Sequence, residues 1–501
     1  MSKPSPDPSK NIGLAFRRVA EANPDLPAII AADITLTYAK LRQVADVFAY
    51  RMYEHGIASG SLVALQTRDI IASIATMLGA SMLGAQFTTL EKELLETAAV
   101  TPTHLLRSPD ATPIDGLKYI VMDESWSPKH TTLPTDAPTL FPDLTDAEAD
   151  WWIIHTSGTT GAPKYMGVSQ RVVFDRSMAA RVDFHPHQTR LCSLFNCTAR
   201  PFYVRATAAL LNACTIVDTV DPAFMSNTGV TLVCGAPRQV VAWLDGRVLK
   251  PKLPLLQVSG SRLSDETAKI LLASFDRVED VYGASETNKS FVNVKAMVGE
   301  SVVATGKPCD SVIEILSDSF APCPPGVIGH VRVQNPYMVN GYIDAPEANA
   351  SAFQNGWFHP GDYGLWGERG ELIIHGRSDD VINIGGRKIA ADAVDRALMV
   401  DGIDSAVCFR DPRIPDLGGL VALVVLSPGA DPDHCVATAH AACLSALGAT
   451  ATPSHIFVVK EIPVTFDGVP RRNECQRLIL NLLQGGASNG PSTGKDIGTR
   501  A

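Results

Sequence analysis

The chain of 501 residues lacks several features that mark particular classes of protein. Acidic residues outnumber basic ones, and the formal net charge of −10 disfavours non-specific binding to nucleic acid. The ten cysteines do not have the paired spacing of a zinc site, so we expect reduced thiols in a cytoplasmic protein. Residues 1–10 have no apolar signal core and predict a disordered lead.

Long, purely apolar runs are also missing. Residues 70–90 carry no charge and approach the length of a membrane span, but Ser, Thr, Gly and Gln interrupt them. We therefore expect a buried helix followed by a strand, and no membrane span. His185 and His187 flank a proline, and two such loop histidines are more often solvent-exposed than metal-binding.

Apolar runs alternate with amphipathic stretches through most of the chain, which is typical of βαβ units and mostly parallel sheets. Expected helices cover residues 11–23, 38–55 and 433–447. Expected strands cover residues 62–65, 230–234, 255–259, 278–282, 406–410, 420–426 and 456–459. The pattern after residue 377 is that of a small α+β unit, and the Gly- and Ser-rich residues 484–501 predict a flexible tail.

One run of nine residues has the composition of a phosphate-binding loop. It follows the apolar residues 151–155, which predict a buried strand. Its glycines can adopt positive φ, so that backbone N–H groups converge on an anion, while the hydroxyls and the terminal lysine add donors. The candidate phosphate ligands are Thr156, Ser157, Gly158, Thr159, Thr160, Gly161 and Lys164. The lysine does not directly follow the last glycine, unlike that of the common NTPase loop.

The order of these nine residues resembles the phosphate loop of the AMP-forming adenylating enzymes, which include acyl- and aryl-CoA synthetases, peptide-synthetase adenylation domains and luciferases. The resemblance implies an α/β fold in two parts. A large N-terminal domain of several subdomains would cover residues 11–376. A small, mobile α+β lid would cover residues 377–483, with a hinge near Asp379.

A second segment resembles the family's Tyr-Gly-x-Thr-Glu motif, with Ser285 in place of the usual Thr. The resemblance implies that Tyr282 stacks on adenine next to Gly283, that Ser285 contacts the α-phosphate, and that Glu286 holds Mg²⁺. A carboxylate is a suitable ligand for a hard cation between phosphate oxygens. Alone, this segment would be a loop with an ordinary surface glutamate.

Two further segments match the family in order. Asp362, in a Trp-x-x-Pro-Gly-Asp run, would accept hydrogen bonds from both ribose hydroxyls, and Arg377 would contact the nucleotide. Gly385 and Gly386 would line the tunnel for a pantetheine thiol after the lid turns about Asp379.

The C-terminal end departs from the family at one position. The family carries a lysine that bridges the substrate carboxylate and the α-phosphate, and Val469 occupies its place in this chain. Removing a comparable donor costs about 10²–10³ in rate. Three interpretations stay open: Arg471 or Arg472 supplies the cation, the adenylation step is slow or bypassed, or the chain is a non-catalytic adenylate-binding or regulatory homologue.

The acyl pocket is less well defined by the sequence. Asn196 stands where α-amino-acid-activating domains carry a carboxylate, so a neutral polar or aryl acid is the better expectation, although Asn196 could instead cap a turn. Ser259, Gly260 and Ser261 should flank the pocket. Arg200 and Arg205 could meet a second carboxylate or a phosphate, or lie on the surface.

Together, the resemblance and these residues predict an ATP- and Mg²⁺-dependent acid ligase. A small carboxylic acid would be activated as its adenylate and passed to coenzyme A by default. Because the chain shows no carrier domain, a separate carrier protein or an amine is an alternative acceptor.

Overall fold

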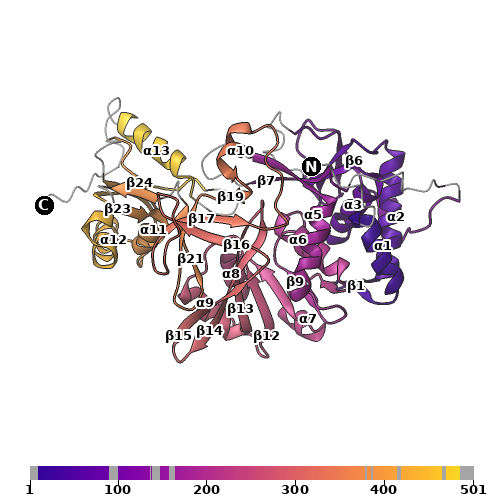
Figure 1. Cartoon of the computed structure of the whole chain (residues 1–501), viewed down its shortest axis with the longest axis horizontal. Coiled ribbons are helices and arrows are strands. Elements are labelled where there is room, and N and C mark those ends of the chain that lie inside the picture. The colour runs from indigo at the N-terminus through magenta and orange to yellow at the C-terminus, as the bar shows by residue number, and fades with distance from the viewer. Residues whose placement is uncertain are drawn as a thin grey trace.

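The computed structural model describes residues 10–89, 100–135, 137, 147–156, 164–377, 381–384, 387–413, 419–464 and 470–485. Two large sheets of mostly parallel strands form the N-terminal part, an antiparallel sheet follows, and a smaller α+β unit lies at the C-terminal end (Figure 1). The α/β fold class expected from the sequence is confirmed. The division between domains at residues 376 and 377 stays a prediction.

A nine-stranded sheet carries most of the residues of interest. From β13 to β1 all neighbouring strands are parallel, whereas β2, β14 and β15 are antiparallel to their neighbours. In spatial order the strands are β15 (Ser301–Pro308), β14 (Asn288–Val298), β13 (Phe275–Ala284), β12 (Leu253–Val258), β11 (Leu232–Gly235), β9 (Arg190–Ser193), β10 (Thr215–Val217), β1 (Pro27–Ile30) and β2 (Thr35–Thr37).

A six-stranded sheet is parallel except at its β7–β8 edge. Its order is β6 (Ile120–Val121), β5 (His104–Arg107), β3 (Leu62–Gln66), β4 (Gln86–Thr89), β7 (Asp150–Thr156) and β8 (Lys164–Ser169). Side chains of both sheets share one apolar core with five helices, namely α1 (Ile12–Ala22), α2 (Tyr38–Glu54), α3 (Ile70–Leu83), α5 (Gln170–Ala179) and α6 (Arg200–Leu211).

Helix α3 lies at the centre of this core, and all of its residues are buried. This explains why the sequence of α3 is apolar on every side without belonging to a membrane. The expected order of a buried helix and then a strand is confirmed by α3 and β4. Among the described residues no helix combines the length and hydropathy needed to cross a bilayer.

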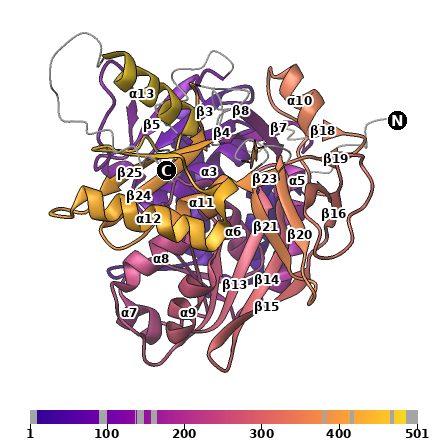
Figure 2. The same ribbon diagram turned by 90° about the vertical axis from the view of Figure 1, so that its left-hand side faces the viewer.

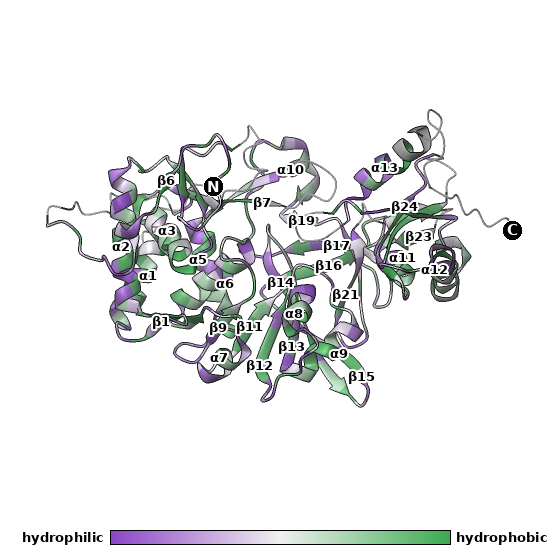
Figure 3. Ribbon diagram, turned by 180° about the vertical axis from the view of Figure 1, so that it is seen from behind, coloured by the Kyte–Doolittle hydropathy of each residue, from purple (hydrophilic) through white to green (hydrophobic). Residues whose placement is uncertain are grey.

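The nine-stranded sheet has its own helices on its other side. They are α7 (Pro222–Asn227), α8 (Pro237–Leu244) and α9 (Asp265–Ser274), and they bury a second apolar cluster against β11, β12 and β13. Figure 3 colours β12 green, as expected for a strand that is covered on both faces.

The antiparallel sheet connects the N-terminal part to the C-terminal unit. It is formed by β16 (Val312–Leu316), β17 (Gly329–Gln334), β18 (Phe353–Gln354), β19 (Trp357–Phe358), β20 (Asp362–Trp366) and β21 (Leu372–Arg377), with α10 (Pro346–Ala352) before β18. Figure 2 shows β20 and β21 beside β13 and β14. A buried amide joins the two sheets, because Asn293 of β14 donates to the carbonyl of Leu372 and accepts from its N–H.

The C-terminal unit begins with the hairpin β22 (Val381–Ile384) and β23 (Arg387–Ala390). A three-stranded sheet follows, made of β24 (Ile403–Arg410), β25 (Leu420–Leu426) and β26 (His455–Val458), with helices α11 (Ala391–Leu398), α12 (Pro432–Leu447) and α13 (Arg472–Gly485). Two apolar clusters lie on opposite faces of this sheet. The helices and strands expected from the sequence are confirmed with shifts of a few residues at their ends.

Candidate functional site

The ends of the predicted phosphate loop are fixed next to each other. Thr156 ends β7, Lys164 begins β8, and the two residues are paired across the hairpin. The Lys164 ammonium lies 5.3 Å from the centre of the Tyr342 ring. Five predicted ligands of this loop lie outside the described residues: Ser157, Gly158, Thr159, Thr160 and Gly161.

Tyr342 connects this hairpin to the predicted metal ligand. Its segment pairs with β8, since Tyr342 bridges Met166 and the Ile343 N–H donates to the carbonyl of Tyr165 over 2.7 Å. The Tyr342 hydroxyl donates to Oε1 of Glu286 over 2.6 Å. The side chain of Glu286 is therefore held by one donor, and the residue is only 5% exposed.

The backbone around Glu286 is held by a buried arginine that the sequence did not single out. Arg176 of α5 is 4% exposed, and its guanidinium donates to the carbonyl oxygens of Glu286 and Tyr337 over 2.8–3.0 Å. Burial, together with nearby Arg200 and against the opposing effect of Glu286, lowers the pKa of Arg176 to about 9. Nothing in the local sequence distinguishes Arg176 from a surface helix residue, because its partners are more than 100 residues away.

The predicted adenine and ribose ligands also come together. The Tyr282 hydroxyl, on β13, donates to Oδ2 of Asp362, on β20, over 2.7 Å. The Arg377 guanidinium lies 3.7 Å from the other carboxylate oxygen and donates to the carbonyl of Pro360. Burial and the adjacent carboxylate raise the pKa of the Tyr282 phenol well above its usual value, so it stays a donor.

Gly283 lies near the end of β13, and Ser285 lies in the connection from β13 to β14. A Cβ at Gly283 would stand 2.0 Å from the carbonyl oxygen of Asn288, so a glycine is required where this tight hairpin begins. The Ser285 carbonyl lies 3.5 Å from Arg176, which therefore binds two successive carbonyls of this connection. The roles predicted for both residues toward phosphate stay predictions.

The residues predicted for the acyl pocket lie after the ends of β9 and β12, two strands of the nine-stranded sheet that are separated by β11. Asn196 is exposed, and its side-chain oxygen accepts from the N–H and hydroxyl of Thr198, which is the turn-capping arrangement. Ser259 accepts a hydrogen bond of 3.1 Å from Arg205. Gly260 has a φ of +94° with open space where a Cβ would be, and Ser261 is exposed.

The two arginines considered as substitutes for the missing lysine have partners within the C-terminal unit. Arg471 forms an ion pair of 3.0 Å with Glu474. Arg472 pairs with Asp395 and donates to the carbonyl of Cys408. Val469 itself lies outside the described residues, as do Asp379, Gly385 and Gly386. The catalytic role proposed for either arginine therefore requires it to leave these partners.

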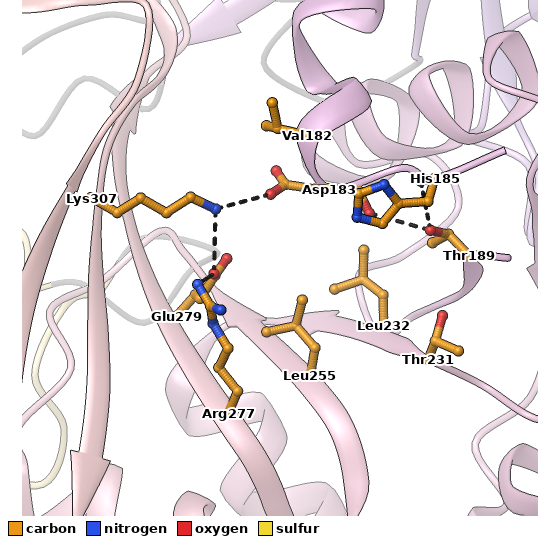
Figure 4. A pocket seen from close by; sticks show the side chains of 10 residues that line it. All are labelled: Val182, Asp183, His185, Thr189, Thr231, Leu232, Leu255, Arg277, Glu279 and Lys307. Carbon is orange, nitrogen blue, oxygen red and sulfur yellow. Dashed lines mark hydrogen bonds and ion pairs between the residues drawn. The ribbon is translucent and has the colours of Figure 1, made fainter.

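A separate cavity of about 190 Å³ lies away from these residues (Figure 4). Lys307 reaches two buried carboxylates in it, Asp183 at 3.7 Å and Glu279 at 3.8 Å, and Arg277 pairs with Glu279 at 2.6 Å. None of the predicted site residues lines this cavity. The charged side chains of this cavity pair with one another, and their ion pairs connect β13 and β15 to the segment after α5.

Asp280 lies on β13 two residues before Tyr282, and therefore on the same side of the strand. Burial raises the pKa of its carboxyl to about 7, although Lys295 and Arg262 act in the opposite direction. Arg262 in turn lies 3.7 Å from Asp392 of α11. The protonation of Asp280 thus changes near neutral pH, beside the predicted adenine site and the C-terminal unit.

The chemistry of this arrangement suits a nucleotide with a bound cation. Asp362 presents two acceptor oxygens, one to Tyr282 and one to Arg377, and a carboxylate can exchange such donors for hydroxyls of a sugar. Glu286 is a nearly buried carboxylate with a hydroxyl donor at one oxygen, which fits a ligand for Mg²⁺. In the described residues no group of three or more His, Cys, Asp or Glu side chains forms a metal cluster.

Comparison with known proteins identifies the family. The model of the AMP-binding enzyme family matches residues 16–343, and the chain belongs to this family. It is similar to a salicylyl-CoA synthase / salicylate adenylyltransferase of a Streptomyces species, with 27% identity over 91% of each protein. It is also similar to the 2-succinylbenzoate–CoA ligase of Geobacillus kaustophilus, with 25% identity over 94% of the chain and 98% of the relative.

Solved structures support the fold. O-succinylbenzoate coenzyme A synthetase from Bacillus subtilis, in complex with AMP, matches with a TM-score of 0.76 and 18% identity, covering 92% of this chain and 97% of that one. The amide bond synthetase McbA from Marinactinospora thermotolerans matches with a TM-score of 0.74 and 20% identity over 93% and 99%.

The contacts of Arg176 predict that Arg176→Met weakens the use of Mg²⁺, because the Glu286 backbone loses its donors. We expect the Mg²⁺ concentration for half-maximal ATP binding to rise about 10–100-fold, the range for a group that orients a metal ligand. Calorimetric titration of ATP at several Mg²⁺ concentrations measures this, with circular dichroism to confirm folding. Arg181→Met, at an exposed position, is the control. An unchanged Mg²⁺ requirement in folded Arg176→Met would show that the hydrogen bonds of Arg176 to the Glu286 backbone are not needed for the use of Mg²⁺.

The position of Asp280 predicts a pH-dependent stability. Its folded-state pKa of about 7 lies above the usual value of about 3.9, so the folded state binds the proton more tightly. The contribution of Asp280 to stability therefore falls as pH rises from about 4 to about 7. Asp280→Asn should raise the thermal unfolding midpoint more at pH 8 than at pH 5. Asp276→Asn, at an exposed position on the same strand, should show no such difference; an equal shift at both pH values for Asp280→Asn contradicts the assignment.

Proposed function

We propose that this chain is an AMP-forming ligase that activates a small carboxylic acid with ATP and transfers it to a thiol, by default that of coenzyme A. The observation that carries the proposal is the convergence of Tyr282, Asp362 and Arg377 beside Glu286, with Lys164 connected through Tyr342. Their types and spacing suit the adenine, ribose, phosphate and metal ends of one nucleotide.

In the proposed reaction a carboxylate oxygen of the acid attacks the α-phosphorus of ATP, the bond to the β-phosphate breaks, and pyrophosphate leaves. Asp362 and Arg377 hold the ribose side, and Glu286 holds Mg²⁺, which would neutralise phosphate charge. Lys164 and the hydroxyls of its loop stabilise the charge on the departing oxygens. The acceptor then attacks the acyl carbon, and AMP leaves.

The acceptor is proposed from relatives and from the predicted tunnel at Gly385 and Gly386. Two relatives are named for coenzyme A products, a salicylyl-CoA synthase and a 2-succinylbenzoate–CoA ligase. A carrier protein or an amine is a second possibility, because a fatty acid–[acyl-carrier-protein] ligase and an amide bond synthetase also match. A cytoplasmic location is proposed from the ten free cysteines.

A second function is supported by one specific observation. Val469 stands in place of the lysine that contacts the reacting oxygens in the family. Both neighbouring arginines have partners within the C-terminal unit. A non-catalytic protein that binds adenylates and regulates a partner would tolerate that loss.

Pyrophosphate release from ATP and Mg²⁺ across a panel of carboxylic acids separates the two functions. A ligase releases pyrophosphate and forms AMP with at least one acid, and Glu286→Gln should slow this release by about 100-fold or more. Tight AMP binding without pyrophosphate release from any acid would support the regulatory protein instead.

The missing lysine gives a further prediction. Val469→Lys should accelerate formation of the adenylate, because it returns a cation to the reacting oxygens. Single-turnover formation of acyl-adenylate measures the step directly. Val464→Lys, at an exposed position of the same segment, is the matched control. An unchanged rate in Val469→Lys would mean that another cation has taken over the role.

A further inference from the structure

Two arginines on α6 stand out by their lack of a counter-ion. Arg200 is the first residue of this helix and Arg205 lies further along it. Within the described part of the chain, neither guanidinium has a carboxylate at ion-pair distance. Some other arginines are paired with carboxylates, as Arg17 is with Asp46 and Arg332 with Glu314, whereas Arg176 and Arg247 donate to carbonyls.

Arg205 is held in place by neutral groups. Its guanidinium donates to the hydroxyl of Ser259 and to the carbonyl of Pro201, each over 3.1 Å, and it lies 5.2 Å from the centre of the Phe195 ring. Its Nε is buried and has no hydrogen-bond partner among the described residues. The side chain is thus fixed and partly desolvated while its charge is left uncompensated.

Arg200 places a second positive charge beside the first. Burial, together with repulsion from Arg205 and against the opposing effect of Glu286, lowers the pKa of Arg200 to about 10, so the two guanidiniums interact. Arg200 also lies near Arg176. Arg200 is thus within electrostatic reach of Glu286 and of Arg205, and Arg205 in turn donates to Ser259.

Holding two like charges partly out of water without a counter-ion is costly for folding. A protein tolerates this cost where a bound ligand supplies the missing negative charge. The N–H donors of a guanidinium match the two oxygens of a carboxylate. Ser259, the partner of Arg205, lies just after β12, where Gly260 leaves open space.

We propose that the acid activated by this chain carries a second anionic group, and that Arg205, assisted by Arg200, binds it beside Ser259. The proposal rests on the ligase function above and names its substrate class: dicarboxylic acids rather than neutral acids. One carboxylate would face the phosphate end near Glu286 and react, while the other would neutralise the two arginines. Arg205 is then a specificity-determining residue.

Matched acid pairs test this proposal. Hexanoate is compared with adipate, and benzoate with isophthalate, in pyrophosphate release and in calorimetric binding with AMP present. The wild type should prefer the dicarboxylic member of at least one pair about tenfold or more in kcat/KM, since a buried polar site rejects an analogue that lacks its partner. Arg205→Met should abolish that preference and leave the KM for ATP unchanged. Arg181→Met is the control and should behave as the wild type.

Three outcomes overturn the proposal. The first is equal or better use of the neutral member in every pair. The second is a rise in the KM for ATP with unchanged acid selectivity in Arg205→Met, because that result would assign the arginines to nucleotide phosphates. If no acid supports pyrophosphate release, the ligase function fails. Calorimetric binding of the diacids then tests the substrate class separately. Diacid binding that Arg205→Met abolishes would uphold the substrate class, whereas no diacid binding would overturn it as well. A phosphonate analogue of adipate distinguishes a carboxylate site from a phosphate site.

Discussion

The structure depends on bringing two carboxylates from separate sheets to one junction and giving each a fixed donor. Asp362 comes from the antiparallel sheet and meets the Tyr282 hydroxyl of the nine-stranded sheet. Glu286 follows β13 and meets the Tyr342 hydroxyl, whose segment is attached to β8 of the six-stranded sheet. All three N-terminal sheets therefore contribute to one site. A buried carboxylate without such donors would be strongly disfavoured, so these contacts also hold the sheets together.

Local sequence patterns were sufficient for most of the elements and for the residues that follow strand ends. Strand β13 buries Phe275 and Val278 and ends two residues before Glu286, as expected of ligand sites at the ends of strands. The pairing of Tyr282 with Asp362 could not be derived from periodicity, because 80 residues separate them. The resemblance to the family assigned these residues to the adenine and the ribose of one nucleotide, but it did not give their hydrogen bond.

Other features were beyond local patterns altogether. Arg176 acts through carbonyls more than 100 residues away, which no spacing rule reveals. An asparagine at position 196 suits both a pocket residue and a turn cap, and only its hydrogen bonds to Thr198 show that it caps a turn. The partners of Arg471 and Arg472 depend on how α13 packs on the C-terminal sheet.

The distribution of positive charge links these observations to function. Arg176 donates to the carbonyls of Glu286 and Tyr337, whereas Arg200 and Arg205 have no carboxylate at ion-pair distance among the described residues. The loss of lysine at Val469 makes fixed cations of the N-terminal part more important, because they do not depend on the position of the C-terminal unit. The chain is acidic overall, with a net charge of −10, so these arginines are a local exception to its charge.

A crystal structure of the protein with AMP and Mg²⁺ tests the central claim most directly. We expect the adenine ring on Tyr282, the ribose hydroxyls on the Asp362 oxygens in place of the Tyr282 and Arg377 donors, and the cation on Glu286. A nucleotide bound elsewhere, for instance in the cavity beside Lys307, with Asp362 still bonded to Tyr282, would contradict the account.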